Sequence, residues 1–306
     1  MDCRAAPGGR RLKNAMEAPV RLRYSVELSY QVRTTGADFI FNVQAARTAR
    51  QHVVWESLAT TQYVPLNEYC DPISSGRFLR LRAYAGELAL RYEGVVDLVH
   101  HRQAPQGVQE IGIADLPGPV LPFLYPSRYC ESDKLNAFAM AQFGSLWQGH
   151  ARVQAICDWV QRHVDFTSGS SVGTTGAVDT LEQRQGVCRD SAHLMIALCR
   201  AVNIPARFTT GLDFGADVAL GPPDFHAYVE AYLAGRWYMF DPSGTAIPMG
   251  FIRLTSGRDA ADSAYASIFG DVVPVGRALS IRAEAGADGV LREPYRTTDA
   301  LSTSDT

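Results

Sequence analysis

The chain has 306 residues, 46% of them hydrophobic, so it can bury a sizeable core, and its length favours about two domains. A formal net charge of -3 gives no argument for a nucleic-acid partner. The sequence has no apolar run near the roughly 18 residues that a membrane span needs and no apolar secretory core in its first residues, so we expect no membrane partner.

The sequence predicts β-strands in the first part of the chain. After a tail over residues 1–20, every second residue from Leu22 to Val32 is apolar, which is the pattern of a half-buried strand. Phe39 and Phe41 repeat the alternation, and a further pair of strands is centred on residues 85–86. These features predict a small antiparallel β-sandwich over residues 21–104, with no catalytic constellation in it.

The second part begins after a segment rich in proline and glycine, residues 105–126, which we interpret as a linker. Apolar residues at helical spacing follow it, and a second apolar helix is predicted to begin near Cys188 and to end before Pro205. Strands are then predicted over residues 206–212, 225–233 and 236–241. We therefore predict a catalytic domain over 127–292 and a flexible C-terminal tail over 293–306.

Cys188 is the first candidate catalytic residue. At the first turn of a helix, unpaired backbone N–H groups and the helix dipole favour an anion, and these conditions stabilise a thiolate. The same N–H groups could donate hydrogen bonds to the oxyanion of a tetrahedral intermediate. Taken alone, a cysteine at a helix start is more often a structural residue.

His226 and Asp241 follow in an order that suits a nucleophile. His226 is predicted on a strand, with Tyr228 and Glu230 on the same face, and Asp241 ends the next strand of a hairpin that turns near Gly235. A carboxylate there could accept the ring N–H of His226 and direct its other nitrogen toward the thiol. The three residues together are much stronger evidence than any one of them.

At these positions the chain resembles the transglutaminase-like superfamily, in its bacterial and archaeal branch. The matching segments are Leu181–His193, Arg200–Arg207, Asp224–Glu230 and Trp237–Ser243. The resemblance covers about residues 146–250, and the sandwich before it is similar to the N-terminal region of bacterial members. It implies an α+β fold with a papain-like core, in which a helix-borne cysteine packs on an antiparallel sheet, and a triad of Cys188, His226 and Asp241. Tyr228 stands where a tryptophan is common in the family, and Ser243 where a threonine is common.

The chemistry we expect is acyl transfer from an amide or peptide through a thioester on Cys188, with His226 moving the proton and Asp241 orienting His226. Water as acceptor makes a peptidase or amidase, which we favour, whereas an amine acceptor makes a protein-glutamine gamma-glutamyltransferase. The alternative from another class is a non-catalytic interaction module with a vestigial triad. The natural substrate and the oligomeric state are left open.

Weaker candidates surround this constellation. Residues that could shape the substrate pocket or bind the oxyanion are Gln183, Gln185, Tyr228 and Trp237. His193 reads as a packing residue, because five helical residues place it about 140° from Cys188. Asp213, Asp217 and Asp224 could form a calcium loop, but a solvated loop or a wall of the cleft fits their spacing better.

The six cysteines are dispersed and contain no CxxC pair, so the sequence gives no zinc-ribbon or thioredoxin-like motif. We expect no cofactor and no metal, a peptide or protein substrate as partner, and a place in the reducing cytoplasm.

Overall fold

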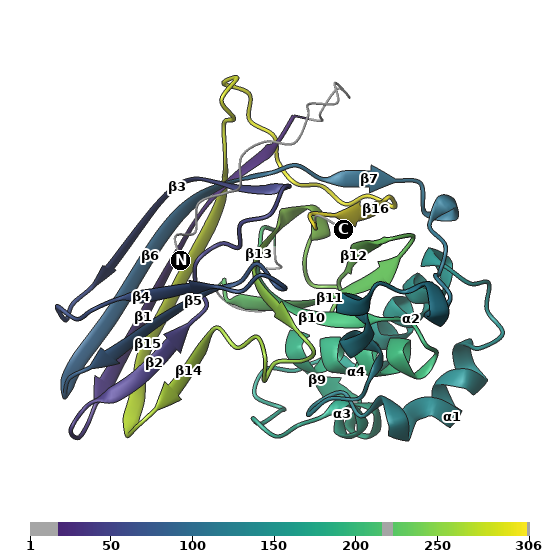
Figure 1. The fold of residues 1–306 in the computed structure, drawn as a ribbon, viewed down its shortest axis with the longest axis horizontal. Helices are drawn as coiled ribbons and strands as arrows, with labels where there is room; N and C mark the ends of the chain where they lie inside the picture. The colour runs from purple at the N-terminus through teal and green to yellow at the C-terminus, as the bar shows by residue number, and fades with distance from the viewer. Residues whose placement is uncertain (1–17, 216–222, 305–306) are drawn as a thin grey trace.

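The computed structural model describes residues 18–215 and 223–304, so most of the predicted tail over residues 1–20 lies outside the described residues. Two four-stranded sheets, in the orders β15-β1-β6-β3 and β14-β2-β5-β4, form the sandwich on the left of Figure 1. Their strands are β1 (Val20–Val32), β2 (Ala37–Phe41), β3 (Gln51–Thr60), β4 (Asn67–Cys70), β5 (Arg77–Ala83), β6 (Gly86–Leu98), β14 (Ala266–Phe269) and β15 (Val272–Glu284). The predicted sandwich is confirmed.

Strand β1 shows how the sequence builds this sandwich. Its residues alternate between fully buried and partly exposed along nearly its whole length. The apolar side chains, from Leu22 to Val32, enter the core between the two sheets, because a strand turns successive side chains to opposite faces. The strand pairs in antiparallel register with β6 on one side and with β15 on the other.

The last long strand corrects our domain boundaries. Residues 266–284, which we placed in the catalytic domain over 127–292, form β14 and β15 and pair with β2 and β1 of the sandwich. Alternation predicts which face a strand buries, but it does not specify the partner strand across more than 200 intervening residues. The chain therefore forms β1 to β6 of the sandwich first, then the second domain, and completes the sandwich with β14 and β15.

The segment between the domains is more structured than a linker. It contains three 3₁₀-helices, η1 (Pro105–Gly107), η2 (Ile113–Asp115) and η3 (Gly118–Leu124). Proline occupies an early position in η1 and η3, where its missing N–H has no partner to lose. Phe123 of η3 packs edge-on against Trp237, with ring centroids 5.2 Å apart, so this segment adheres to the second domain.

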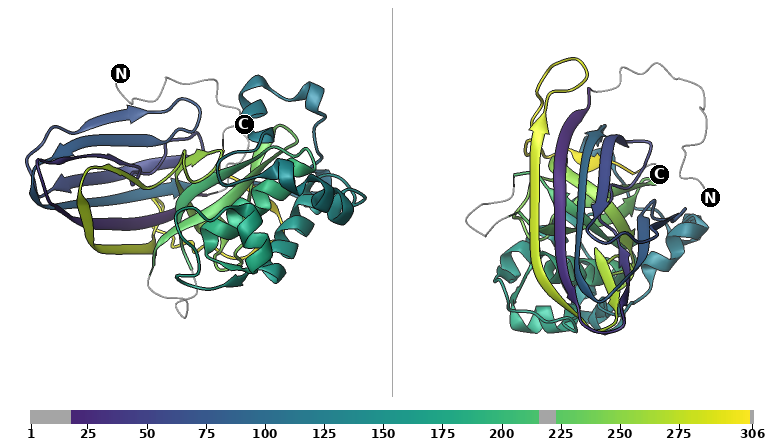
Figure 2. Two further views of the ribbon diagram at one scale, coloured as in Figure 1. Left: turned by 90° about the horizontal axis from the view of Figure 1, so that it is seen from below. Right: turned by 90° about the vertical axis from the view of Figure 1, so that its left-hand side faces the viewer.

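The second domain packs helices against one face of an antiparallel sheet in the order β12-β11-β10-β13. Its helices are α1 (Ser132–Phe143), α2 (His150–His163), α3 (Ala177–Gln183) and α4 (Cys188–Ala201), and its strands are β8 (Asp165–Phe166), β9 (Gln185–Gly186), β10 (Ala206–Asp213), β11 (Phe225–Leu233), β12 (Arg236–Phe240) and β13 (Phe251–Gly257). Figures 1 and 2 show the helices on the side away from the sandwich. Every residue of α4 from Asp190 to Ala201 is buried, so this helix forms the centre of the domain.

Strands β11 and β12 form the predicted hairpin. Ala234 and Gly235 turn it with φ angles of 47° and 81°, the left-handed pair that a tight two-residue hairpin turn requires. The register places Val229 opposite Phe240. Asp241 therefore lies immediately beyond the end of the ladder.

The sheet of the second domain also packs against the sandwich. Leu212, Ile252 and Leu254 belong to the same apolar cluster as the sandwich core. The side chain of Gln51 on β3 accepts the backbone N–H of Arg253 at 2.9 Å and donates to its carbonyl at 2.8 Å. The two domains therefore share a core.

The C-terminal segment differs from our prediction of a flexible tail over residues 293–306. Within the described residues it forms β16 (Ala300–Ser302), which pairs with β7 (His101–Gln103). Ala300 and Leu301 are buried, and their burial fixes the segment. Across the part of the chain that the structure describes, no helix is long and apolar enough to cross a membrane.

Candidate active site

Cys188 is the first residue of α4 and is half-buried at the edge of the core. The start of the helix is fixed by Asp190, whose carboxylate accepts the backbone N–H of Val187 at 2.8 Å. Gly186 permits this bond, since a Cβ at that position would lie 2.7 Å from the Cβ of Asp190. The fold thus presents the Cys188 thiol among the unpaired N–H groups of a helix N-terminus.

His226 lies on β11, buried beside that helix. Its ring stacks on Phe251 of β13, with centroids 5.2 Å apart and planes inclined by 25°. Tyr228, two residues along the strand, stacks on the same Phe251 at 4.3 Å, as expected for residues on one face of a strand. Cys188 and His226 line the same cleft, and the thiol acts to raise the pKa of the His226 imidazole.

Asp241 reaches His226 from beyond the end of β12. Its Oδ1 lies 3.3 Å from Nε2 of His226. The same oxygen accepts the hydroxyl of Ser243 at 2.6 Å, and Oδ2 accepts the backbone N–H of Ala246 at 2.9 Å. Burial acts to raise the pKa of Asp241, but His226 and these hydrogen bonds outweigh burial and hold the pKa below its usual range. The carboxylate is therefore ionised and held in a fixed orientation.

The charges around His226 favour its protonated form. Burial acts to lower the pKa of His226, but the Asp241 carboxylate and its hydrogen bond, followed by the Cys188 thiol, raise it well above its usual value. A protonated imidazole beside a thiol stabilises the thiolate, which is the nucleophilic form of cysteine. The structure thus brings Cys188, His226 and Asp241 together in an arrangement able to carry out nucleophilic catalysis.

The thiol and the imidazole open into a cleft of about 630 Å³. One wall is made by the sandwich: Arg277 of β15 lies there, in an ion pair with Asp224 at 2.5 Å, and Tyr265 stacks on Phe225 at 4.0 Å. The sequence did not predict this wall, because the contribution of Arg277 depends on the return of β15 to the sandwich.

The other candidate pocket residues lie outside this cleft. Gln183 and Gln185 are exposed and do not line it. Tyr228 is fully buried and stacks on Phe251, which in turn stacks on the His226 ring. Trp237 is buried against Phe123 and Tyr232 on another part of the sheet.

His193 is a packing residue, as its helical position indicated. It is fully buried, stacks on Tyr129 at 5.0 Å and accepts the backbone N–H of Ala260 at 3.2 Å. Burial lowers its pKa to about 3, so it is neutral in the folded protein.

The predicted acidic loop is described in part. Asp217 lies outside the described residues, whereas Asp213 and Asp224 both line the cleft. No cluster of three or more His, Cys, Asp or Glu side chains suited to a metal ion occurs within residues 18–215 and 223–304. Asp213 contacts the second ring nitrogen of His226, and no motif in the sequence had indicated this contact.

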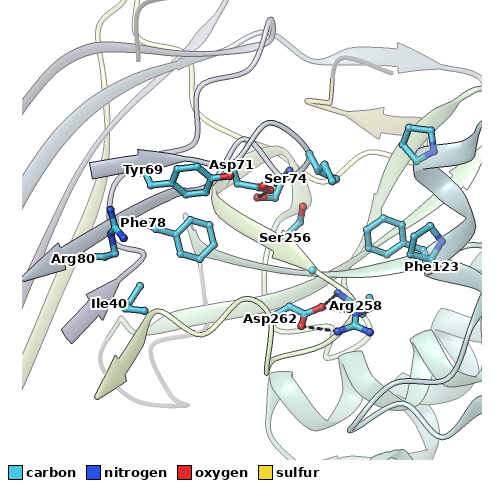
Figure 3. Close-up of a pocket in the computed structure, with 14 residues that line it drawn as sticks. Ile40, Tyr69, Asp71, Ser74, Phe78, Arg80, Phe123, Ser256, Arg258 and Asp262 are labelled. Carbon is cyan, nitrogen blue, oxygen red and sulfur yellow. Dashed lines mark hydrogen bonds and ion pairs between the residues drawn. The ribbon is translucent and has the colours of Figure 1, made fainter. Parts of the chain in front are cut away.

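A second hollow, of about 670 Å³, lies between the two domains away from the thiol. Tyr69 and Phe78 of the sandwich face Phe123 across it, and Arg258 pairs with Asp262 at its edge (Figure 3). Neither cysteine nor histidine is found among the described residues that line this hollow.

Comparison with known proteins agrees with this geometry. Residues 140–242 match the model of the transglutaminase-like superfamily, and residues 20–119 match that of the bacterial transglutaminase N-terminal domain. The structure of a candidate cysteine protease from Cytophaga hutchinsonii is similar over 94% of this chain and 98% of that one, with 37% identity and a TM-score of 0.86.

Curated relatives occur in mycobacteria. An uncharacterized protein of Mycobacterium leprae is 32% identical over 46% of this chain and 52% of its own length. One of Mycobacterium tuberculosis is 33% identical over 36% of this chain and 40% of its own. The matches thus span about half the length of these relatives, or less. The family models and the Cytophaga structure support a cysteine-dependent enzyme, and the chain belongs to the transglutaminase-like superfamily.

Proposed function

We propose that this protein is a cysteine-dependent hydrolase of amide or peptide bonds. The observation that carries the proposal is that Cys188, at the start of α4, lines one cleft with a His226 ring whose Nε2 lies 3.3 Å from Asp241. A nucleophile, a base and a residue that orients the base are the parts that acyl transfer through a thioester requires.

The proposed reaction has two halves. In the first, the Cys188 thiolate attacks the amide carbon, N–H groups at the start of α4 stabilise the oxyanion, and His226 gives its proton to the departing amine. In the second, His226 takes a proton from water as that water attacks the thioester, and the intermediate then releases the acid and restores the Cys188 thiolate beside a protonated His226. Asp241 accepts the N–H of His226 throughout and stabilises the imidazolium.

Water is favoured over an amine as the acceptor by the lining of the cleft. Charged side chains are among the residues that line it, including Arg189, Asp213 and Asp224. Such groups retain water, and no tryptophan stands among the described lining residues to shield a thioester from it. A volume of about 630 Å³ suits a few residues of a peptide.

Incubation with a library of short peptides and peptide amides tests the proposal. Mass spectrometry of acid-quenched enzyme should find an acyl group on Cys188, and the product should be the free acid even when a primary amine is present. Cys188→Ala should form neither. Products that contain the amine would identify a transglutaminase instead. A library that is neither cleaved nor attached to Cys188 would contradict acyl transfer on peptides.

A further inference from the structure

Asp213 occupies a position that the proposed triad leaves unexplained. It is the last residue of β10, it is 6% exposed, and its Oδ2 lies 3.4 Å from Nδ1 of His226. Asp241 lies 3.3 Å from Nε2 of the same ring. Each nitrogen of His226 therefore faces a carboxylate of its own.

The sheet fixes this arrangement. His226 is paired with Gly211 across β10 and β11, and Asp213 is paired with Phe251 across β10 and β13. Gly211 lets the strands approach, because a Cβ there would lie 2.4 Å from the carbonyl oxygen of Ile252. The same three strands thus place Phe251 on the face of the imidazole and Asp213 at its Nδ1 edge.

Two flanking carboxylates select one protonation state of the ring. A neutral imidazole that donates from Nε2 to Asp241 presents a lone pair at Nδ1, and a lone pair next to the Asp213 carboxylate is repulsive. An imidazolium presents an N–H to each carboxylate. Burial raises the pKa of Asp213, His226 acts to lower it, and Asp241 and Asp224 act to raise it. From β13, the uncharged ring of Phe251 stacks on the imidazole, and the charged Arg253 is paired with Glu230.

Cys188, Asp213 and His226 all line the cleft, and Nε2 of His226 is taken by Asp241, so the thiol is left to act at the Nδ1 edge beside Asp213. We propose that Asp213 is a positioning residue that accepts Nδ1–H of the His226 imidazolium and keeps the thiolate–imidazolium pair formed across neutral pH. When substrate enters, that proton is close to both the sulfur and the departing amine. The inference rests on the proposed function and extends it, because it states that Asp213 sets the pH range over which the same site is active.

Nitrogen-15 NMR of His226 tests this placement without any substrate. In Cys188→Ala, where no thiolate can hold the proton, we expect both ring nitrogens to stay protonated well above pH 6.5, the usual midpoint of a histidine. Adding Asp213→Asn should lower the midpoint by at least about one pH unit, the usual effect of removing an adjacent opposite charge. A midpoint near 6.5 in Cys188→Ala, or one that Asp213→Asn leaves in place, would overturn the proposal. The signal is assigned by its loss in His226→Gln.

The pH profile of kcat/KM gives the catalytic consequence. We expect Asp213→Asn to shift the basic limb to lower pH by at least about one unit, and Asp213→Glu to restore part of that shift. Asp262→Asn, a carboxylate in the second hollow, serves as control and should leave the limb in place. If kcat/KM falls in Asp213→Asn while the basic limb stays at the same pH, Asp213 has only a structural role and the assignment is refuted.

Asp213→Ser is a second variant for both measurements if Asp213→Asn does not fold, and it should move the midpoint and the limb in the same direction. An inactive enzyme whose His226 titrates as expected would refute the proposed hydrolase but not the role of Asp213.

Discussion

Asp241 contacts His226 although the two are not paired in the hairpin that carries them: Oδ1 of Asp241 lies 3.3 Å from Nε2 of His226, while the ladder ends at Val229 and Phe240. The contact depends on the turn after β12, where Ser243 and Ala246 donate hydrogen bonds to the carboxylate. The orientation of the imidazole is thus set by a loop.

Replacing this carboxylate tests its orienting role. Asp241→Asn keeps the shape of the side chain but presents an amide that does not stabilise the imidazolium, so we expect kcat/KM to fall by about 10⁴-fold, the loss typical of this change in serine proteases. Ser243→Ala removes one supporting hydrogen bond and should lower kcat/KM far less. Steady-state kinetics with circular dichroism as a check of folding measures both. An Asp241→Asn enzyme that is folded and fully active would show that Asp241 is not part of the machinery.

The wall supplied by the sandwich makes a second prediction. Arg277 pairs with Asp224 at the mouth of the cleft, so Arg277→Gln should raise KM severalfold for peptides that extend past this pair and change kcat little. Arg82→Gln, which removes an exposed ion pair with Asp38 elsewhere in the sandwich, is the matched control. Equal kinetics in the two variants would mean that substrate does not reach the sandwich.

A buried ion cluster links three strands of the second domain's sheet, β10, β11 and β13. Glu230 is fully buried on β11 and accepts hydrogen bonds from Arg207, at 2.7 Å, and from Arg253 on β13. Glu230→Gln leaves two buried guanidinium groups without their counter-ion, and we expect a loss of about 3–5 kcal/mol in the free energy of unfolding. Urea denaturation measures it.

The control for Glu230 is Glu27→Gln, which removes an exposed ion pair with Arg91 and should change stability by less than about 1 kcal/mol. Similar losses in Glu230→Gln and Glu27→Gln would show that the buried cluster contributes no more than a surface pair.

His193 predicts how stability depends on pH. The pKa of His193 is lowered to about 3 in the folded protein and is near 6.5 in the unfolded chain. Below about pH 6.5 the unfolded chain therefore binds a proton at His193 that the folded protein does not bind. Stability contributed by the neutral ring is therefore present above about pH 6.5 and is lost as pH falls, by about 2 kcal/mol at pH 5. Urea denaturation between pH 7 and pH 5 should show a smaller loss in His193→Asn than in wild type. Equal losses would indicate that His193 is protonated in the fold.

Local signals in the sequence were sufficient for the candidate triad and for the strands around it. Cys188 lies two residues after Gly186 at a helix start, and the turn at residues 234–235 fixes the hairpin well enough to place Asp241 near His226. The alternation over Leu22 to Val32 likewise predicted the face that β1 buries. Each of these signals lies within a few residues of the feature that it predicts.

Features that depend on distant pairing were not predicted. Arg277 reaches the cleft because β15 pairs with β1, and Asp213 meets His226 because β10 pairs with β11, and neither register can be derived from periodicity alone. Trp237 was expected to shape the substrate pocket or bind the oxyanion, but it packs on Phe123 of η3. The prediction of a flexible tail failed for the same reason, since β16 is fixed by pairing with β7.

The pH dependence of iodoacetamide labelling at Cys188, read by peptide mass spectrometry in wild type and in His226→Ala, tests the proposed Cys–His pair most directly. Cys130, Cys157 and Cys199 are buried free thiols and serve as internal controls that should label slowly. The proposed pair predicts fast labelling of Cys188 at pH 6 that collapses in His226→Ala. Slow labelling that is equal in both proteins would contradict an activated thiol and, with it, the proposed enzyme.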